Sequence, residues 1–571
     1  MPKVSWIATA AIVLLLPIFL YPLQLSDEPR VAHTSLQMVQ SGEFAVPTVN
    51  GEPFLQTPPL CYWLLGGWLR IVGYEPDGLA RVVPVMAALG TVALTALLMA
   101  RYVGAGAGFL SAAILISLFQ FWEISHRIVS DMVLTFFTTL GFSSFVRLAL
   151  DESPRARAGV AMGLGIGAAF LTKGLPGPVF LGVTVVATFL LHRSVRTRGH
   201  VLALLVAVLV ATAVVLPWIL SLYRVDPSYP STLLVEHVWK RATQGGLHNP
   251  NNWQFFHRML LHTLPWAPLL LCVVGVRLWG LRRWPRQRGM LLNDLFLFFF
   301  LLPFVLLLCS RSKRNLYLLP TLPALAMLLA SWLEPHLYHP RVERGARIAV
   351  YILAVAGILG IGAVFATTPG SASSIAWVVL VVFLYWLLRW WRTRARALPL
   401  GGVGLPASIT MLLLCIAVVV SAWGAFVFTL RSPKYSADEL GRVVVERERS
   451  GHEVVGYALT EREVGATAWY LRHPFTHLQD EVALVEFLRD DRARKSALVI
   501  AVDVLASLKE RPTGFLLETW KETARPQVRR RTLSVLVPFG RTGTAVHEDR
   551  EKSRENVEAD DEIDEKGATS Q

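Results

Sequence analysis

The sequence predicts an α-helical polytopic membrane protein with a small α/β domain near its C-terminal end. Of its 571 residues, 53% are hydrophobic and only 17% are charged, and the mean hydropathy is +0.47. Such a composition is typical of chains that span a membrane many times. Long apolar runs recur, and each approaches the roughly 20 residues that a helix needs to cross about 30 Å of hydrocarbon. After Leu430 the composition becomes that of a folded soluble domain.

The apolar runs predict about 13 transmembrane helices within residues 1–430. They are 5–23, 79–101, 105–122, 131–149, 158–172, 175–192, 200–223, 256–280, 293–309, 315–333, 347–366, 375–391 and 405–430. The first run contains Pro17 and lacks a small-residue cleavage site, so we expect a retained span and not a cleaved signal peptide.

The distribution of arginine predicts the orientation of these spans in the membrane. Arginines crowd five alternate connections, in residues 147–157, 193–198, 277–288, 341–347 and 389–396. The positive-inside rule then places these connections and the N-terminus on the cytoplasmic side of the membrane. Because this orientation signal accounts for much of the net charge of +14, we discount a nucleic-acid partner. The loops 24–78, 123–130, 224–255 and 310–314 fall together on the opposite, outer face.

Residues 431–540 alternate helical and strand-like patterns, which predicts a small α/β domain on the outer face. Helices are expected at Asp438–Arg449 and Glu481–Arg489, and strands at 454–459, 497–502 and 533–537. Residues 541–571 are charged and nearly free of aromatic residues, which predicts a disordered tail. The four cysteines show no metal-binding or disulfide spacing.

Asp27 and Asp131, two acidic residues at the outer face, are the candidate catalytic groups. Asp27 and Glu28 follow the first span, and Asp131 begins the fourth on the same face. Each has a structural alternative, since Asp27 suits a helix N-cap and Asp131 suits an N-cap or an ion pair with Arg127. However, ionisable residues at a membrane boundary cost free energy unless they are paired or functional. Two converging carboxylates suit a general base and a cation or metal partner.

The same face carries more cations than the topology rule predicts. Lys173 lies in a break between two spans, where snorkelling is its structural alternative. Arg241 lies in the 224–255 loop, and Lys313 and Arg314 precede Tyr317. Fixed cations beside a phenol would hold a lipid-linked phosphate and stabilise it as a leaving group. We therefore expect the carboxylate of Asp27 and the cations near 313 to face one hollow at the membrane surface.

His248, in the 224–255 loop, is a candidate metal ligand, and a lone histidine is more often structural than a ligand. The aromatic residues from Trp253 onwards suit a belt at the membrane interface.

Several motifs in this order resemble bacterial lipid A 4-amino-4-deoxy-L-arabinose transferases and the related protein mannosyltransferases. The motifs are Asp27-Glu28-Pro29-Arg30, Gly51-Glu52-Pro53-Phe54, Pro58-Pro59-Leu60-Cys61-Tyr62-Trp63, Arg127-Ile128-Val129-Ser130-Asp131, Leu171-Thr172-Lys173-Gly174, Pro265-Trp266 and Lys313-Arg314 with Tyr317. They cover roughly residues 5–335. The resemblance implies a C-type glycosyltransferase fold.

The resemblance implies an enzyme of the bacterial inner membrane that moves a sugar from undecaprenyl phosphate to a lipid, protein or glycan acceptor. Its active site and its C-terminal domain would lie on the periplasmic side. Asp27 would be its catalytic carboxylate, assisted by Asp131. Lys173, Arg241, Lys313, Arg314 and Tyr317 would bind the donor phosphate, and we add Glu28, Arg30, Gln56 and Tyr62 as substrate contacts. No organic cofactor is implied.

The chain departs from this family at Gln56-Thr57, where the relatives have Glu-Lys before Pro-Pro. In the relatives the Glu is associated with metal binding and the Lys with the donor phosphate. Gln is a poor metal ligand and Thr carries no charge, so a divalent metal stays an open alternative. Two other functions also stay open, namely a transporter or flippase of a lipid-linked anion and a non-catalytic lipid binder.

Overall fold

The computed structural model divides into two compact units, which are described separately. The first comprises residues 1–442, 460–474 and 528–530, and the second comprises residues 443–459, 475–527 and 531–571. The residues that the structure describes are 14–19, 23–24, 27–151, 155–233, 235, 251–281, 288–310, 313–346, 348, 409, 412–413, 415–417, 419–420, 436–509, 517, 520–524, 526–528 and 531–538.

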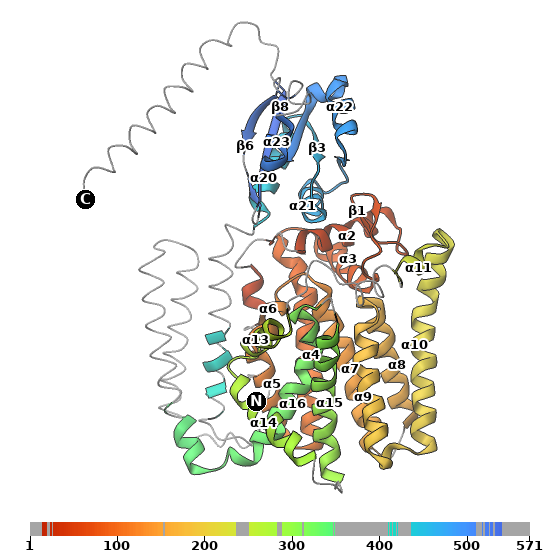
Figure 1. Cartoon of the computed structure of the whole chain (residues 1–571), viewed down its shortest axis with the longest axis vertical. Helices are drawn as coiled ribbons and strands as arrows, with labels where there is room; N and C mark the ends of the chain where they lie inside the picture. The colour runs from red at the N-terminus through yellow and green to blue at the C-terminus, as the bar shows by residue number, and fades with distance from the viewer. Residues whose placement is uncertain are drawn as a thin grey trace, which may run out of the picture. The chain divides into compact units, whose positions relative to one another are not determined.

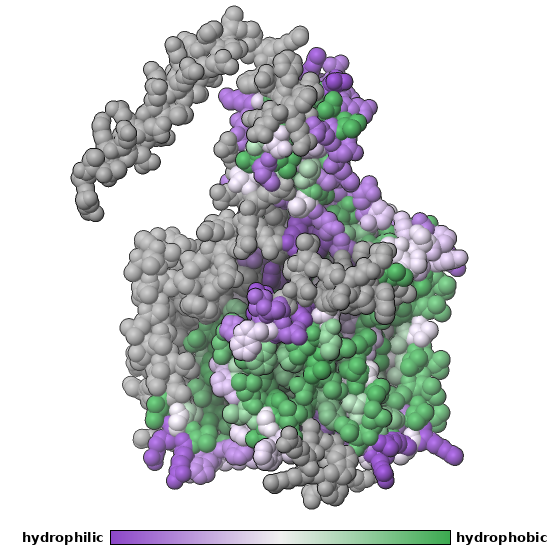
Figure 2. Space-filling view, viewed as in Figure 1, coloured by the Kyte–Doolittle hydropathy of each residue, from purple (hydrophilic) through white to green (hydrophobic). Residues whose placement is uncertain are grey.

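The first unit is a bundle of apolar helices, as the sequence predicts (Figure 1). Among the residues that the structure describes, five helices are long and apolar enough to cross a membrane: 77–102, 130–150, 198–225, 291–309 and 315–336. On the face seen in Figure 2, the described part of the bundle is covered largely by apolar side chains. Leu202, Leu205 and Leu209 of one helix, for example, are each more than half exposed. The predicted spans 347–366 and 375–391, with most of 5–23 and 405–430, lie outside the described residues.

The helical elements of this unit have the following bounds. They are η1 (Leu16–Phe19), α2 (Glu28–Ser41), α3 (Leu60–Val72), η2 (Asp77–Arg81), α4 (Val82–Tyr102), α5 (Ala105–Ser117), α6 (Phe119–Ser125), α7 (Ser130–Leu150), α8 (Arg155–Lys173), α9 (Pro176–Leu191), η3 (Arg193–Val195), α10 (Arg198–Val225), α11 (Tyr229–Ser231), α13 (Asn252–His262), α14 (Ala267–Leu281), α15 (Arg288–Cys309), η5 (Asn315–Thr321), α16 (Leu322–Leu333), η6 (Glu334–His336) and α21 (Glu461–Leu471). A short hairpin joins β1 (Thr48–Val49) to β2 (Glu52–Pro53).

Small residues allow α8 to pack closely between α7 and α10. A Cβ added to Gly165 would lie 2.6 Å from the backbone nitrogen of Gly141, and one on Gly163 would lie 2.5 Å from the carbonyl oxygen of Ala207. Close backbone approach at small residues is a usual basis of helix association in membranes. This close packing fixes the position of α8, the helix that ends at Lys173.

Two predicted spans are broken. The expected helix 105–122 bends by 71° between α5 and α6, and the expected helix 256–280 bends by 112° between α13 and α14. The two breaks meet, since Trp266 Nε1 donates to Ser117 Oγ at 2.8 Å and Phe119 N donates to Leu264 O at 3.5 Å. Irregular backbone at membrane depth requires such partners within the protein. From α6, Gln120 then donates to the carbonyl of Asn315 at 2.7 Å, which fixes the start of η5.

At one end of the bundle, α2, α3 and α21 share a hydrophobic cluster. Val31 and Leu36 of α2 pack with Leu65 of α3 and with Trp469 of α21, and Trp469 is fully buried. This cluster supports the first turns of α2 and α3, which carry the predicted acidic and tyrosine residues.

The second unit is a mixed β-sheet with helices. Its strands are β3 (Glu453–Tyr457), β4 (Thr476–Leu478), β5 (Ser496–Ala501), β6 (Trp520–Ala524), β7 (Gln527–Val528) and β8 (Arg531–Pro538), in the order β4-β3-β5-β8-β6 with β7 beside β8. β3 is parallel to β4 and β5, whereas β8 is antiparallel to β5 and β6. Every residue of β5 is buried, as expected of a central strand covered on both faces.

The predicted helices of this region are found as α20 (Asp438–Arg449), which the division at residue 442 crosses, and α22 (Glu481–Arg489). The three predicted strands are found as β3, β5 and β8. The helix α23 (Val502–Lys509), the strands β4, β6 and β7, and α21 were not expected.

Candidate active site

Asp27 lies at the N-cap position of α2, and its carboxylate makes no capping hydrogen bond. Instead, Oδ1 accepts from Arg30 Nη2 at 2.9 Å and from Arg462 Nε at 3.4 Å. Oδ2 accepts no hydrogen bond from any residue that the structure describes. The N-cap alternative therefore does not account for this carboxylate.

Four arginines keep Asp27 ionised. Burial by itself would raise the pKa of this carboxyl, but the charges of Arg30, Arg462, Arg314 and Arg127 outweigh burial and hold its pKa below the ordinary value. Arg314 is separated from Asp27 by almost half of the chain in sequence. The structure thus brings the segment near residue 313 within electrostatic range of the predicted catalytic carboxylate.

Glu28 corrects the expectation of a substrate contact. Its side chain is fully buried, with Arg81 Nη2 2.8 Å from Oε2. The backbone nitrogens of Gln24 and Ile128 also donate to it, at 2.8 Å and 3.0 Å. Both carboxylate oxygens are therefore occupied by the protein, and Glu28 joins the segment before α7 to the start of α2. No local pattern in the sequence distinguishes the two adjacent acids in this way.

Asp131, Lys173 and Tyr317 form a second cluster. Lys173 Nζ lies 2.6 Å from Asp131 Oδ1 and 5.3 Å from the centre of the Tyr317 ring. The partner of Asp131 is thus Lys173, and not Arg127, which pairs with Glu123 at 3.3 Å. The snorkelling alternative for Lys173 is likewise wrong, because this buried carboxylate holds the lysine.

The local sequence explains why Lys173 lies there. Gly174 has φ of 78°, and its nitrogen donates to the carbonyl of Phe170 at 2.7 Å, which ends α8 directly after Lys173. Pro176 then starts α9 at a position where its missing N–H costs nothing. The charged end of Lys173 consequently lies in the break between two helices.

Arg314 and Tyr317 flank the start of η5, and the neighbouring Lys313 is only 5% exposed. Lys313 Nζ donates to the Asn252 side chain and, at 3.3 Å, to Leu308 O. Among the described residues, Arg314 has no ion-pair partner within contact distance. Arg314 therefore has a charge to offer a ligand, whereas Lys313 is held by neutral acceptors.

The first turn of α3 lies between the two clusters. Tyr62 is 4% exposed, and its hydroxyl lies 2.6 Å from Thr57 Oγ1, so the expected substrate contact is not exposed in this structure. Burial raises the pKa of this phenol to about 12, and the charges of Arg30 and Asp27 also act on it. Burial likewise raises the pKa of Cys61 to about 12, with contributions from Asp131 and Lys173. The charges of Arg30 and Asp27 thus act on Tyr62, and those of Asp131 and Lys173 act on the adjacent Cys61. The two groups of charges therefore lie near each other.

Sequence reasoning missed two residues of this site, Glu461 and Arg462. Glu461 Oε1 accepts from Gln56 Nε2 at 2.7 Å, and Oε2 accepts from Arg30 at 3.2 Å. The signal that could have found them is the run Thr460-Glu461-Arg462-Glu463. A Thr and a Glu three positions apart form a capping box at the start of a helix.

These residues do not fit a metal site. Gln56 Nε2 donates a hydrogen bond to Glu461, and guanidinium groups donate to Asp27. The carboxylates of Glu461 and Asp27 are therefore acceptors for side chains of the protein. Within the described part of the chain, no group of three or more His, Cys, Asp or Glu could hold a metal ion. The candidates Arg241 and His248 lie outside the described residues.

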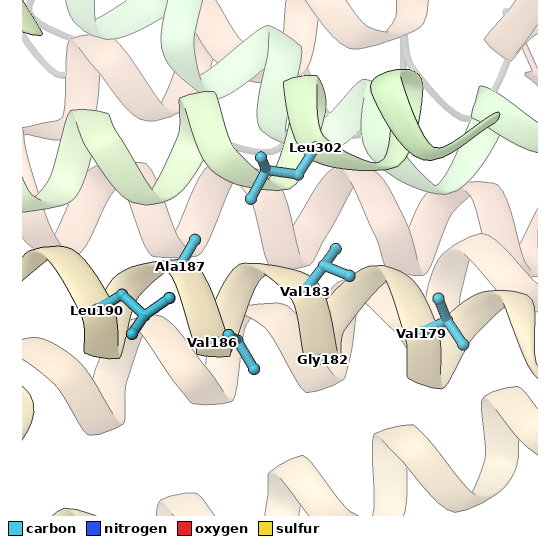
Figure 3. Close-up of a pocket in the computed structure, with 7 residues that line it drawn as sticks. All are labelled: Val179, Gly182, Val183, Val186, Ala187, Leu190 and Leu302. Carbon is cyan, nitrogen blue, oxygen red and sulfur yellow. The ribbon is translucent and has the colours of Figure 1, made fainter. Parts of the chain in front are cut away.

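An apolar groove runs along α9 from a point two turns beyond Lys173. Its volume is 460 Å³, and Figure 3 shows side chains of α9 on one side and Leu302 of α15 on the other. The lining residues are Val179, Gly182, Val183, Val186, Ala187, Leu190 and Leu302. A flexible hydrocarbon chain suits such a surface, which offers almost no polar atoms.

The chain is similar to known proteins both in sequence and in fold. Residues 56–219 match the family model described as dolichyl-phosphate-mannose-protein mannosyltransferase. The chain is 29% identical to an undecaprenyl phosphate-alpha-4-amino-4-deoxy-L-arabinose arabinosyl transferase of Shewanella sediminis over 325 residues, which are 55% of this chain and 57% of that protein. A transferase of the same name from Aeromonas hydrophila is 27% identical over 422 residues, which are 69% of this chain and 74% of that protein.

The fold is that of ArnT from Cupriavidus metallidurans, whose crystal structure was determined bound to undecaprenyl phosphate. The TM-score is 0.71 at 19% sequence identity, and the alignment covers 93% of this chain and 97% of that chain. The chain spans little more than half the length of the first relative named above. These findings confirm the resemblance inferred from the motifs.

Proposed function

Because this chain shares motifs, a family model and a fold with sugar transferases that use polyprenyl phosphates, we propose that it is a membrane glycosyltransferase. Its donor is a sugar linked to a polyprenyl phosphate such as undecaprenyl phosphate. The acceptor is a hydroxyl group of a lipid, protein or glycan at the periplasmic face. The observation that carries the proposal is the ionised carboxylate of Asp27, on which four arginines act, near the Asp131–Lys173 pair at the end of α8.

The charge balance of the site favours an anionic donor. Basic side chains outnumber carboxylates among the described residues that surround Asp27 and Lys173. The bases are Arg30, Arg127, Lys173, Lys313, Arg314 and Arg462, and the acids are Asp27, Glu123, Asp131 and Glu461. A bound phosphate would offset the excess positive charge.

Phosphate recognition is assigned to Lys173, Arg314 and Tyr317, with Arg241 as a further candidate. The polyprenyl chain would leave this end of the bundle along the groove of α9 and α15. When the sugar departs, the phosphate gains negative charge, and fixed cations stabilise that charge more in the transition state than in the ground state.

Asp27 would act on the acceptor. Arg30 and Arg462 hold Oδ1, so Oδ2 is the oxygen that would accept the proton of the acceptor hydroxyl. The hydroxyl oxygen forms a bond to the anomeric carbon while the bond from that carbon to the phosphate oxygen breaks. The proton goes to Asp27, and the electron pair leaves with the polyprenyl phosphate. No step is assigned to a metal.

Transfer of radiolabelled sugar from a polyprenyl-phosphate donor in detergent tests this function. Asp27→Asn should lower kcat by about 10²–10⁴-fold, because a positioned general base contributes that much. Its thermal unfolding and donor binding should stay close to wild type. Glu52→Gln, at an exposed position of the neighbouring hairpin, is the matched control and should keep full activity. Full activity of Asp27→Asn would remove the assignment.

A flippase of a lipid-linked anion is the second candidate, because broken helices of the kind seen at α5–α6 and α13–α14 also occur in transporters. In proteoliposomes, movement of a fluorescent polyprenyl phosphate across the bilayer without sugar transfer would favour it over the transferase.

A further inference from the structure

The helix α21 brings two charged side chains to the site from far beyond the described membrane helices in sequence. Arg462 contacts Asp27 Oδ1, and Glu461 contacts both Arg30 and Gln56. All of these residues belong to the first compact unit. The contacts form a chain of alternating charge, Arg462–Asp27–Arg30–Glu461, which ends at the Gln56 amide.

Packing, and not only these surface pairs, holds α21 against α2. A Cβ on Gly465 would lie 2.7 Å from Arg30 Cα, so the helices touch at the residue that pairs with Asp27. Trp469, one turn further on, is fully buried and donates to Asp77 at 3.3 Å. Arg472 lies over the Trp469 ring and 3.5 Å from the same aspartate. This interface fixes the distance between the two helices.

The first turn of α21 is fixed as well. Thr460 Oγ1 accepts from Glu463 N at 3.4 Å, while Glu463 Oε2 accepts from Thr460 N at 2.7 Å. Such a reciprocal cap orients the residues between its two members. Those two residues are Glu461 and Arg462.

We propose that Arg462 is a positioning residue of the transferase site, which holds Asp27 Oδ1 together with Arg30 and so presents Oδ2 to the acceptor. Glu461 does the same for Arg30 and Gln56. This inference rests on the proposed function, and it extends the site to a segment outside the membrane helices.

Two guanidinium groups on one carboxylate oxygen fix the direction of the other oxygen and favour the ionised form. The other charged or titratable groups that act on Asp27 are Arg314 before η5 and Arg127 before α7, and Asp27 in turn acts on Tyr62 of α3. Arg462 is the second-largest cationic influence after Arg30. Its removal should therefore raise the pKa of Asp27, and the acidic limb of the activity profile should move to higher pH.

The test is the pH profile of sugar transfer for Arg462→Gln. We expect the acidic limb to move upward by about one pH unit, as a lost opposite charge at this distance implies, while the KM for the donor stays unchanged. Arg462→Lys should return most of the shift. Arg492→Gln, which removes an exposed arginine paired with Asp490 in the second unit, is the control and should not move the limb. An acidic limb that stays at its wild-type position in Arg462→Gln overturns the inference.

A second measurement separates this inference from the proposed function. If the wild-type protein transfers no sugar with any donor, the proposed function fails, and the positioning role is judged by thermal unfolding. A lowered pKa of Asp27 stabilises the fold above the ordinary carboxyl pKa of about 4, and this stabilisation disappears at lower pH. The Tm difference between wild type and Arg462→Gln should be largest near pH 7 and should shrink below about pH 4. A difference that is constant with pH rejects the positioning role.

Discussion

The ion pair of Asp131 and Lys173 joins a buried carboxylate to a lysine that is proposed to bind phosphate. Asp131 is 2% exposed, and its carboxylate needs a partner because an unpaired charge at this depth is costly. Lys173 supplies that partner with one hydrogen of its ammonium group, which has three to donate. The remaining donors are the ones that a phosphate would use.

A double variant separates these two roles. Lys173→Met alone should destabilise the protein by about 3–5 kcal/mol, because it leaves Asp131 buried and unpaired. Asp131→Asn combined with Lys173→Met removes both charges and should restore most of the Tm. If Lys173 binds the donor phosphate, the double variant should still show a KM for the donor at least tenfold above wild type, measured by sugar transfer. A double variant with wild-type KM would leave Lys173 a purely structural role.

At the residue scale, sequence patterns identified which residues carry charge at this face but not how the charges are paired. Asp27 and Glu28 are adjacent and chemically alike, yet one is reached by four arginines and the other is fully buried against Arg81. Which acid is buried depends on the packing of α2 against residues near Arg81 and Ile128, far away in sequence. The residues next to Asp27 and Glu28 in the sequence do not indicate that packing.

At the scale of elements, the helices that begin with clear polar signals were predicted within a few residues, and those broken by tertiary contacts were not. The limits of α20 and α22 match the prediction. The breaks between α5 and α6 and between α13 and α14 depend on hydrogen bonds between the two pairs, such as that from Trp266 to Ser117. The apolar pattern continues through Leu118, so periodicity predicted one helix there.

The groove along α9 gives a prediction at this scale. No heavy atom lies within 4 Å of a Cβ placed on Gly182, so Gly182→Phe should fold and should fill part of the groove. Loss of some 55 Å² of apolar contact, at about 25 cal/mol per Å², corresponds to roughly a tenfold higher KM for a long-chain donor. Donors with a short polyprenyl chain, which do not reach Gly182, should be unaffected in the same transfer assay.

A matched substitution controls for a general effect of a larger side chain in the membrane. Gly275→Phe of α14 also enters open space but lies outside the groove, and it should leave both donors unchanged. If Gly182→Phe affects short and long donors equally, the groove does not bind the chain.

At the scale of the whole molecule, the class of the fold could be predicted but the spans could not be counted. Composition and apolar runs predicted a helical membrane protein, and the described residues contain five helices that qualify as spans, or seven with the bent pairs. Length criteria exclude α9, which has 16 residues, although it lies beside α15 and lines the groove with it. The helices of this bundle are supported by their neighbours, so span length alone is a poor guide to their number.

Orientation is the remaining property of the whole chain that the arginine pattern predicts. The helices α8 and α9 form a hairpin, so Lys173 lies at one end of it and Arg193, Arg196 and Arg198 follow the other end. With the arginines in the cytoplasm, the clusters around Asp27 and Lys173 face the periplasm, where a lipid-linked donor and an envelope acceptor can meet.

Cysteine labelling tests this orientation. In a variant whose four cysteines are replaced by alanine, Glu52→Cys and Ser194→Cys each introduce one exposed thiol, the first in the hairpin beside α2 and the second in η3. A membrane-impermeant maleimide added to intact spheroplasts should label Glu52→Cys and should label Ser194→Cys only after permeabilisation. The reverse pattern would place Asp27 and Lys173, with the charged residues around them, in the cytoplasm. Since sugar transfer in detergent does not depend on sidedness, the two assays together separate an error in topology from an error in chemistry.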